Sequence, residues 1–78
     1  MKVNAVKCKE CGDTIFSRAR HDFRECTCGK SFIDGGSYYI RVGGEASNPF
    51  ELEIKATEKE IYDDWNLSKD KLGLIKNG

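Results

Sequence analysis

The sequence has no apolar run near the roughly 20 residues that a membrane-spanning helix requires, so we expect no membrane segment. Residues 1–7 also lack the apolar stretch and the cleavage pattern of a secretory signal peptide. We therefore expect the protein to remain in the cytoplasm, a reducing compartment in which disulfides are rare.

The sequence also has few residues arranged for catalysis. The chain has one histidine, His21, and we find no Ser/His/Asp arrangement, no phosphate-cradling loop and no histidine–glutamate pair of the zinc-hydrolase type. A catalytic zinc needs an open coordination position, and nothing in the sequence argues for one. The sequence predicts a protein that is not an enzyme.

The chain also lacks net charge and has little hydrophobic material. Of its 78 residues, 38% are hydrophobic and 33% are charged. A domain of this size buries only about 60% of the surface that its unfolded chain exposes, so a metal or disulfides often staple it. Residues 1–44 hold eight Lys and Arg against five Asp and Glu, and residues 45–78 hold five against eight. This asymmetry predicts either two surfaces with different partners or two halves that attract each other.

Four cysteines are available to form such a stabilising cross-link. They form two close pairs, Cys8-Lys-Glu-Cys11 and Cys26-Thr-Cys28, and a glycine follows each pair. Two such pairs at this separation are typical of a tetrahedral thiolate site for zinc. The glycines allow sharp turns that aim backbone N–H groups at the thiolates. Another thiophilic metal, free thiols or disulfides are the alternatives, although a disulfide between Cys26 and Cys28 would close a very tight ring. We predict that all four cysteines bind Zn2+.

Hydrophobic alternation and turn residues predict a small α+β fold. Asp34-Gly35-Gly36 favours a tight hairpin, and the two cysteine turns would meet at one end of a small antiparallel sheet. We expect a zinc-ribbon-like β domain over residues 1–44 and, over residues 45–78, a strand and a helical extension packed on it. The predicted strands cover residues 3–7, 14–17, 23–26, 30–33, 37–42 and 50–55.

The C-terminal part predicts one helix or a pair. Thr57-Glu-Lys-Glu60 has the pattern of a capping box, with Thr57 as N-cap. Ser68 is positioned to cap a second helix that carries Leu72 and Ile75 on one face. The whole segment resembles a helix-turn-helix over some 20 residues, although its acidic first helix would repel a phosphate backbone.

Arginine and aromatic residues mark two candidate binding surfaces. Interleaved arginines and aromatics hold nucleic acid in many modules, but a solvated surface around a small aromatic core explains the same pattern. Tyr and Trp on the C-terminal helix either dock it onto the sheet or form an interface anchor. The candidates are Arg18, Arg20, His21, Arg24, Tyr38, Tyr39 and Arg41 near the predicted ribbon tip, and Tyr62 and Trp65 on the helix.

Residues 7–44 resemble a family of small uncharacterised proteins of bacterial phages and prophages. The matching motifs are Cys8-Lys-Glu-Cys-Gly-Asp13, Arg20-His-Asp-Phe23, Cys26-Thr-Cys-Gly29, Asp34-Gly-Gly36 and Arg41-Val-Gly43, together with Ser17 and Tyr39. The resemblance implies a zinc-ribbon-like domain without catalytic residues. It also implies the cytoplasm of a bacterial host as the place of action.

These observations lead to a zinc-binding, non-catalytic protein that acts by binding another macromolecule. Our first hypothesis is a host protein, such as transcription machinery or a defence enzyme that the chain inhibits. The alternative is a nucleic-acid-binding zinc ribbon that uses the arginine tip or the final helix. Capture of a small nucleotide at the glycine- and arginine-rich end of the sheet is a third hypothesis.

Overall fold

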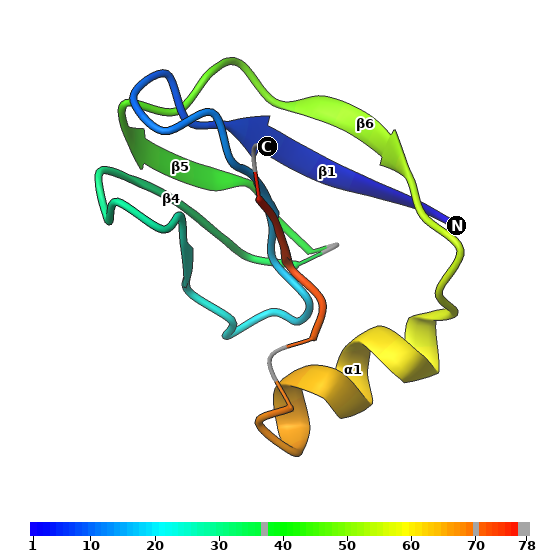
Figure 1. The fold of residues 1–78 in the computed structure, drawn as a ribbon. Coiled ribbons are helices and arrows are strands. Elements are labelled where there is room, and N and C mark those ends of the chain that lie inside the picture. Colours follow the sequence, from blue (N-terminus) through cyan, green and yellow to red (C-terminus); the bar gives the residue numbers. More distant parts are fainter. Residues whose placement is uncertain (37, 70, 77–78) are drawn as a thin grey trace.

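Two antiparallel sheets and one helix form the part of the chain that the computed structural model describes, residues 1–36, 38–69 and 71–76 (Figure 1). The small α+β class is thereby confirmed. None of the described residues belongs to a helix long and apolar enough to cross a bilayer. In chain order the elements are β1 Lys2–Lys7, β2 Thr14–Phe16, β3 Arg24–Glu25, β4 Ser31–Asp34, β5 Arg41–Gly44, β6 Phe50–Glu53, α1 Glu58–Asn66 and β7 Leu74–Ile75.

The first sheet has the strand order β6-β1-β2-β7. Strand β1 is central, and its Ala5 pairs with Phe16 of β2 on one side and Phe50 of β6 on the other. On the far side of β2, Thr14 pairs with Ile75 of β7. Both outer strands therefore come from beyond residue 45, so the second part of the chain completes the sheet that the first part begins.

The second sheet has the order β3-β4-β5. Its outer face carries Phe32, whose ring lies directly over Gly43 of the neighbouring strand. A Cβ at Gly43 would lie only 2.3 Å from the Phe32 ring, so a side chain at that position would displace the aromatic group. Phe23 stacks on Phe32 with the ring centroids 4.8 Å apart.

The strand pairings differ from the sequence prediction in two places. Residues 14–17 and 23–26 belong to two sheets instead of one small antiparallel sheet, because each cysteine turn closes its own hairpin, β1–β2 or β3–β4. The predicted strand over residues 37–42 begins only at Arg41; Ser37 lies outside the described residues. The loop before β5 instead docks on the loop after β2, where the Gly36 N–H donates to Ser17 Oγ at 2.9 Å. A Cβ on Gly36 would meet the Ala19 carbonyl carbon at 2.6 Å.

The core lies between the two sheets. It consists of buried side chains from both sheets, and two of them are cysteines: Val6, Cys8, Ile15, Cys26 and Ile33. So few apolar side chains give a core that is small even for a chain of this length. The cysteine cluster is thus part of the core, not a surface appendage.

Helix α1 begins as the sequence predicts. The Glu60 N–H donates to Thr57 Oγ1 at 3.2 Å, and the Thr57 N–H donates to Glu60 Oε1 at 3.1 Å, which completes the capping box. At the other end Ser68 takes a left-handed conformation with φ +53°. Its N–H donates to the Trp65 carbonyl, and the next N–H donates to the Asp64 carbonyl. This is the Schellman pattern of a helix C-terminus.

The predicted second helix is wrong. Ser68 ends α1 and does not cap a new helix, and Leu74–Ile75 forms strand β7 instead. The cause lies in the helix itself, because the Asp64 carboxylate accepts the backbone N–H groups of Lys71 at 2.9 Å and Leu72 at 3.0 Å. These bonds direct the chain back along β2.

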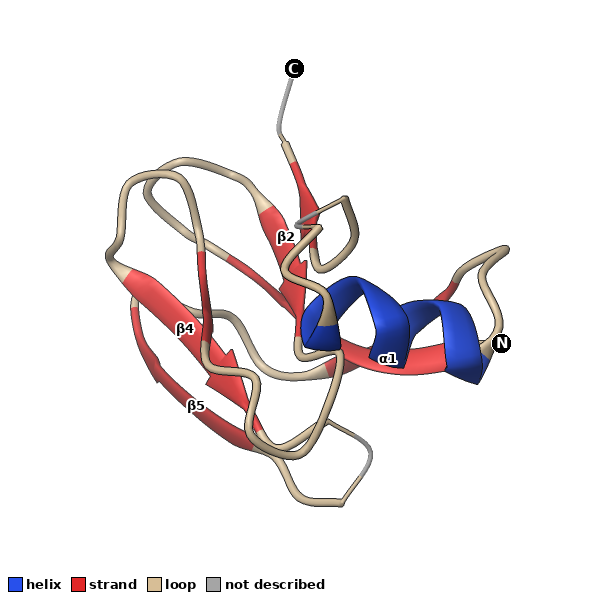
Figure 2. Cartoon of the chain, turned by 90° about the horizontal axis from the view of Figure 1, so that it is seen from below, coloured by secondary structure: helices blue, strands red, loops and turns tan. Residues whose placement is uncertain are grey.

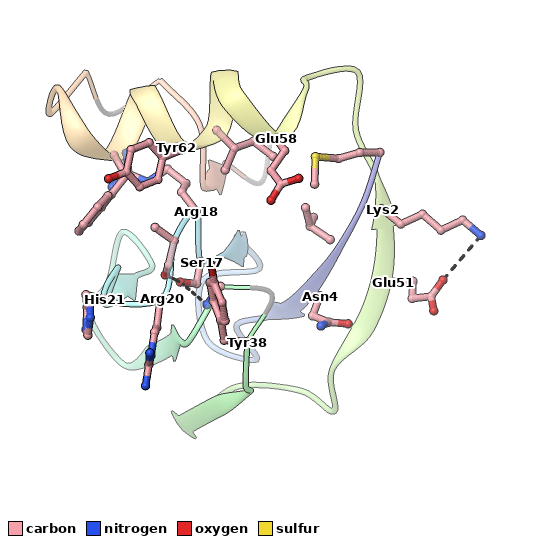
Figure 3. Close-up of a pocket in the computed structure, with 16 residues that line it drawn as sticks. Lys2, Asn4, Ser17, Arg18, Arg20, His21, Tyr38, Glu51, Glu58 and Tyr62 are labelled. Atoms are coloured by element: carbon pink, nitrogen blue, oxygen red, sulfur yellow. Dashed lines mark hydrogen bonds and ion pairs between the residues drawn. The ribbon is translucent and has the colours of Figure 1, made fainter.

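A buried arginine joins the helix to the sheet. Arg18 follows β2 and faces α1 (Figure 3), and its guanidinium pairs with Asp22 and Asp64, each at 2.7 Å. All three side chains are at least 95% buried. The hydrogen bonds that Arg18 donates to Asp22 and to Asp64 raise the pKa of Arg18 against the effect of burial. Burial alone would raise the pKa of Asp64, but bonds from Arg18, Leu72 and Lys71 lower it.

Apolar contact contributes little to the placement of α1. In the view from below the helix overlaps β1 (Figure 2), but Figure 1 shows the two elements well apart, and Ile61 is the one buried apolar residue of the helix among those described. A helix of nine residues is marginal by itself. The ion pairs of Arg18 therefore hold the helix in position.

We predict that Asp64→Ala destabilises the zinc-loaded protein by about 3–5 kcal/mol, because it leaves a buried guanidinium half-paired and two N–H groups unbonded. Urea unfolding followed by circular dichroism measures this loss. The matched control is Lys59→Ala, which removes an exposed ion pair with Asp63 on the same helix and should leave the midpoint nearly unchanged. Equal midpoints for the two variants would contradict the assigned role of Asp64.

Candidate metal centre and a separate cleft

Each cysteine pair lies in a tight turn. In the first turn, between β1 and β2, the Gly12 N–H donates to the Cys8 carbonyl at 2.9 Å and the Cys11 N–H approaches Cys8 Sγ at 3.5 Å. In the second, between β3 and β4, the Gly29 N–H donates to the Cys26 carbonyl at 3.0 Å. Both glycines have a left-handed φ, +78° and +73°, which confirms why the sequence needs them there.

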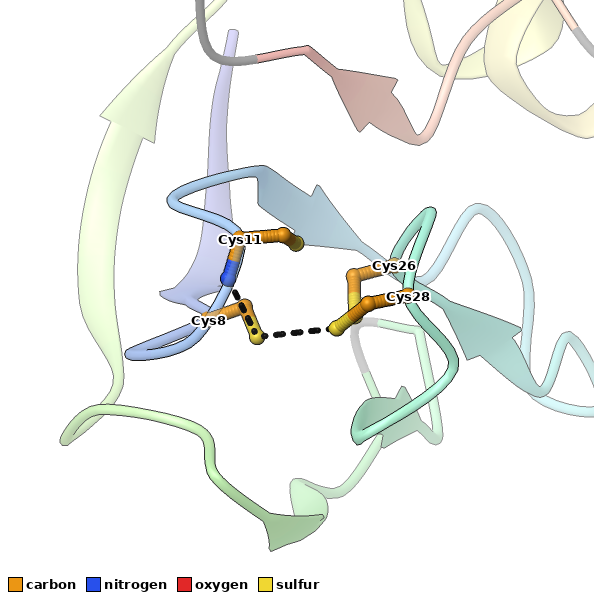
Figure 4. A group of neighbouring side chains, drawn as sticks. All are labelled: Cys8, Cys11, Cys26 and Cys28. Atoms are coloured by element: carbon orange, nitrogen blue, oxygen red, sulfur yellow. Dashed lines mark hydrogen bonds between the residues drawn. The ribbon is translucent and has the colours of Figure 1, made fainter.

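The two turns bring all four sulfur atoms together. Every Sγ lies within 4.8 Å of the others, with Cys8–Cys28 at 3.6 Å and Cys26–Cys28 at 3.4 Å (Figure 4). All four cysteines are free thiols. A tetrahedron with Zn–S bonds of about 2.3 Å has edges of about 3.8 Å, which these separations approach. The cluster therefore fits the predicted metal site, and four sulfur donors favour zinc.

Two braces join the turns. The Asp13 carboxylate, next to the first turn, accepts the Thr27 N–H of the second turn at 2.9 Å. Glu45 bonds to both sides through its backbone, since its N–H donates to the Lys30 carbonyl and its carbonyl accepts the Lys9 N–H, each at 2.8 Å. The relative position of the two turns is thus fixed by groups other than the cysteines.

The four thiols differ in acidity. The Cys11 N–H, followed by the Ser31 hydroxyl, lowers the pKa of Cys8 to about 6. The Lys30 N–H acts to lower the pKa of Cys28, but desolvation and the three neighbouring sulfurs outweigh it and raise that pKa to about 12. Crowded sulfur atoms resist ionising together, so four thiolates require a cation between them. Zn2+ would supply this charge and hold the two turns together.

A cleft of about 390 Å³ lies away from the cysteines, where residues 1–4 at the start of β1 and residues 17–21 after β2 face the helix. Helix α1 forms one wall, and β1 with the loop after β2 forms the opposite side (Figure 3). The Tyr62 and Trp65 rings lie 5.6 Å apart on the helix wall. Tyr38 forms part of the opposite rim and is 73% exposed. The volume is within the range of pockets that hold small molecules or inserted side chains.

The cleft collects many of the binding candidates that the sequence analysis named. Its lining includes Arg18, Arg20, His21, Tyr38, Tyr62 and Trp65. Arg24, Tyr39 and Arg41 lie outside this lining. Arg24 donates to the Leu72 carbonyl at 3.4 Å, and the Tyr39 hydroxyl donates to the Arg20 carbonyl at 3.4 Å. Arg41 is exposed on β5.

Sequence reasoning missed several residues of these sites. In the sequence, Asp13 is marked only by its place after Cys11-Gly12. Nothing there indicates its hydrogen bond to the second turn, which helps to position the metal ligands. Asp64 lies three residues after Ile61, on the same helical face, and this spacing was the available indication of its burial. Asn4 and Glu58 also line the cleft. Nothing in the local sequence shows that strand β1 and the start of α1 meet.

We predict that the protein binds one zinc ion and that Cys11→Ser abolishes stable binding and folding, because the core is too small to replace the metal. Native mass spectrometry gives the stoichiometry, and circular dichroism before and after chelation gives the fold. Lys9→Ser changes an exposed residue of the same turn and should keep both zinc and fold. A metal-free sample of Cys11→Ser that remains folded would sink the prediction.

Comparison with known proteins gives a family for the first part of the chain. No curated protein and no solved structure matched. A family model matches residues 1–44, which contain strands β1 to β5 and all four cysteines. The match includes residues 7–44, where the sequence resemblance lies, and stops before β6, α1 and β7. The chain belongs to the family described as Domain of unknown function (DUF7695).

Proposed function

We propose that the protein is a zinc-stapled, non-catalytic module that binds another protein through the cleft between α1 and the loop after β2. The observation that carries this proposal is the exposure of aromatic groups around one concave site, with Tyr62 49% and Tyr38 73% exposed. Tyr and Trp at such positions are frequent anchors of protein interfaces.

The metal is assigned a structural role. Four sulfur ligands close a tetrahedral site and leave no position for substrate or water, so the ion would stabilise the fold without taking part in a reaction. The cleft lining, in turn, contains no pair of nucleophile and base at hydrogen-bond distance among the described residues. Binding is therefore the activity that the geometry supports best.

Two observations weigh against the alternative hypothesis that the protein binds nucleic acid. The helix-turn-helix resemblance required a second helix where strand β7 stands. Arg18, one of the proposed phosphate contacts, directs its guanidinium to Asp22 and Asp64 inside the protein. Because residues 7–44 resemble phage and prophage proteins, we include in the proposal a partner in the cytoplasm of a bacterial host, with inhibition of transcription machinery or of a defence enzyme as the effect.

Affinity capture from bacterial lysate with paired variants tests the proposal. Tyr62→Ala should lower recovery of the bound protein by at least tenfold, because hot-spot aromatics contribute about 2 kcal/mol or more. Phe23→Ala is the matched control, since Phe23 is similarly exposed, at 53%, on the other sheet. Both variants should retain zinc. Equal recovery with the two variants would remove the cleft as the binding surface.

A further inference from the structure

The floor of the cleft offers few unsatisfied polar groups. Ser17 Oγ lies 2.7 Å from the Asp22 carbonyl oxygen and 2.8 Å from that of Ala19, and it accepts the Gly36 N–H. The Arg18 guanidinium is paired with two carboxylates. A site for a polar small molecule such as a nucleotide needs several convergent polar groups that are free to bond. The part of a ligand that enters this floor is therefore apolar.

The walls extend this apolar character. Met1, Val3 and Ile61 line the same cleft as Tyr62 and Trp65. Ile61 is 3% exposed and forms the deep part of the helix wall. Asn4, on β1, is an amide that could bond a peptide backbone beside an inserted side chain. This combination fits the hydrophobic side chains of a peptide segment.

Basic and acidic side chains are unevenly distributed along the cleft. Lys2 pairs with Glu51 at 3.7 Å, at the outer edge of β1 and β6. Among the described residues no ion pair involves Arg20, His21 or Glu58. In Figure 3 Arg20 and His21 lie at one end of the cleft and Glu58 lies at the other. Arg20 is also held over the Tyr38 ring, 5.8 Å from its centroid.

We propose that the cleft recognises an acidic–hydrophobic segment of its protein partner. Apolar side chains of the segment enter the cleft, and a carboxylate beside them pairs with Arg20. A basic group at the other end of the segment meets Glu58, so that the charges fix the direction in which the segment lies. This inference rests on the proposed function, and it specifies the chemistry that the partner must present.

Trp65 provides the measurement. It is the only tryptophan in the sequence and lies in the wall of the cleft, so its fluorescence reports on occupancy by peptides that lack Trp and Tyr. The first probe is a short peptide with glutamates followed by leucine and phenylalanine and, at its other end, a lysine. The second has lysine in place of glutamate, and the third has serine in place of the apolar residues. We expect the first to bind the zinc-loaded protein about tenfold more tightly than either of the others.

Charge reversal in the protein gives the second readout. Arg20→Glu should weaken binding of the glutamate peptide and strengthen binding of the lysine peptide, so that the lysine peptide binds more tightly than the glutamate peptide. Arg41→Glu reverses an exposed charge on β5, outside the cleft, and should leave the preference as it is. Circular dichroism and zinc content verify that both variants fold.

The outcomes separate this inference from the proposed function. Equal binding of the glutamate and lysine peptides, no binding of either, or no effect of Arg20→Glu would overturn the inference. If Tyr62→Ala still reduces capture of a protein from lysate in that case, the proposed function stands and the partner uses other chemistry. If capture does not depend on Tyr62, the proposed function fails whatever the peptides do.

Discussion

Mutual repulsion among four crowded sulfur atoms is the constraint on which the rest of the structure depends. The sulfurs lie within 4.8 Å of one another, and Cys8 and Cys26 belong to the apolar core. Each sheet contributes one pair, so the cluster is also the junction between the sheets. A divalent cation at this point would convert a repulsive contact into the strongest link of a small core. Asp13 and Glu45 join the two turns without supplying a sulfur ligand.

A second junction gives the molecule its concave surface. Helix α1 is attached to the sheet by the Arg18 ion pairs and by Ile61, not by a continuous apolar face. Long polar side chains hold two elements farther apart than packed aliphatic side chains would. The space that remains is the cleft, and its walls are the aromatic groups that an apolar interface would have buried. The proposed binding surface is thus a direct result of how the helix is held.

Local chemistry could be predicted from the sequence, and long-range geometry could not. Cysteine spacing predicts the metal ligands, and the Thr57–Glu60 pattern predicts the start of α1, because both depend on residues close in the chain. The pattern of the final segment predicts a helix, but the segment forms strand β7, since its path is set by a carboxylate on another element, Asp64. The cleft could not be predicted from the sequence either. Its two sides meet only after strand β6, from residues 50–53, has paired with β1.

The position of β1 also bears on how the chain reaches its native state. All four cysteines lie within the first 28 residues, so zinc can gather them while the remaining residues are still being synthesised. One edge of β1 nevertheless lacks its partner until residues 50–53 are available, and β2 waits for Leu74 and Ile75. Pairings so distant in sequence slow folding and leave strand edges open to other chains. Early capture of a metal ion would shorten this exposure, because it would fix the hairpins against which the late strands close.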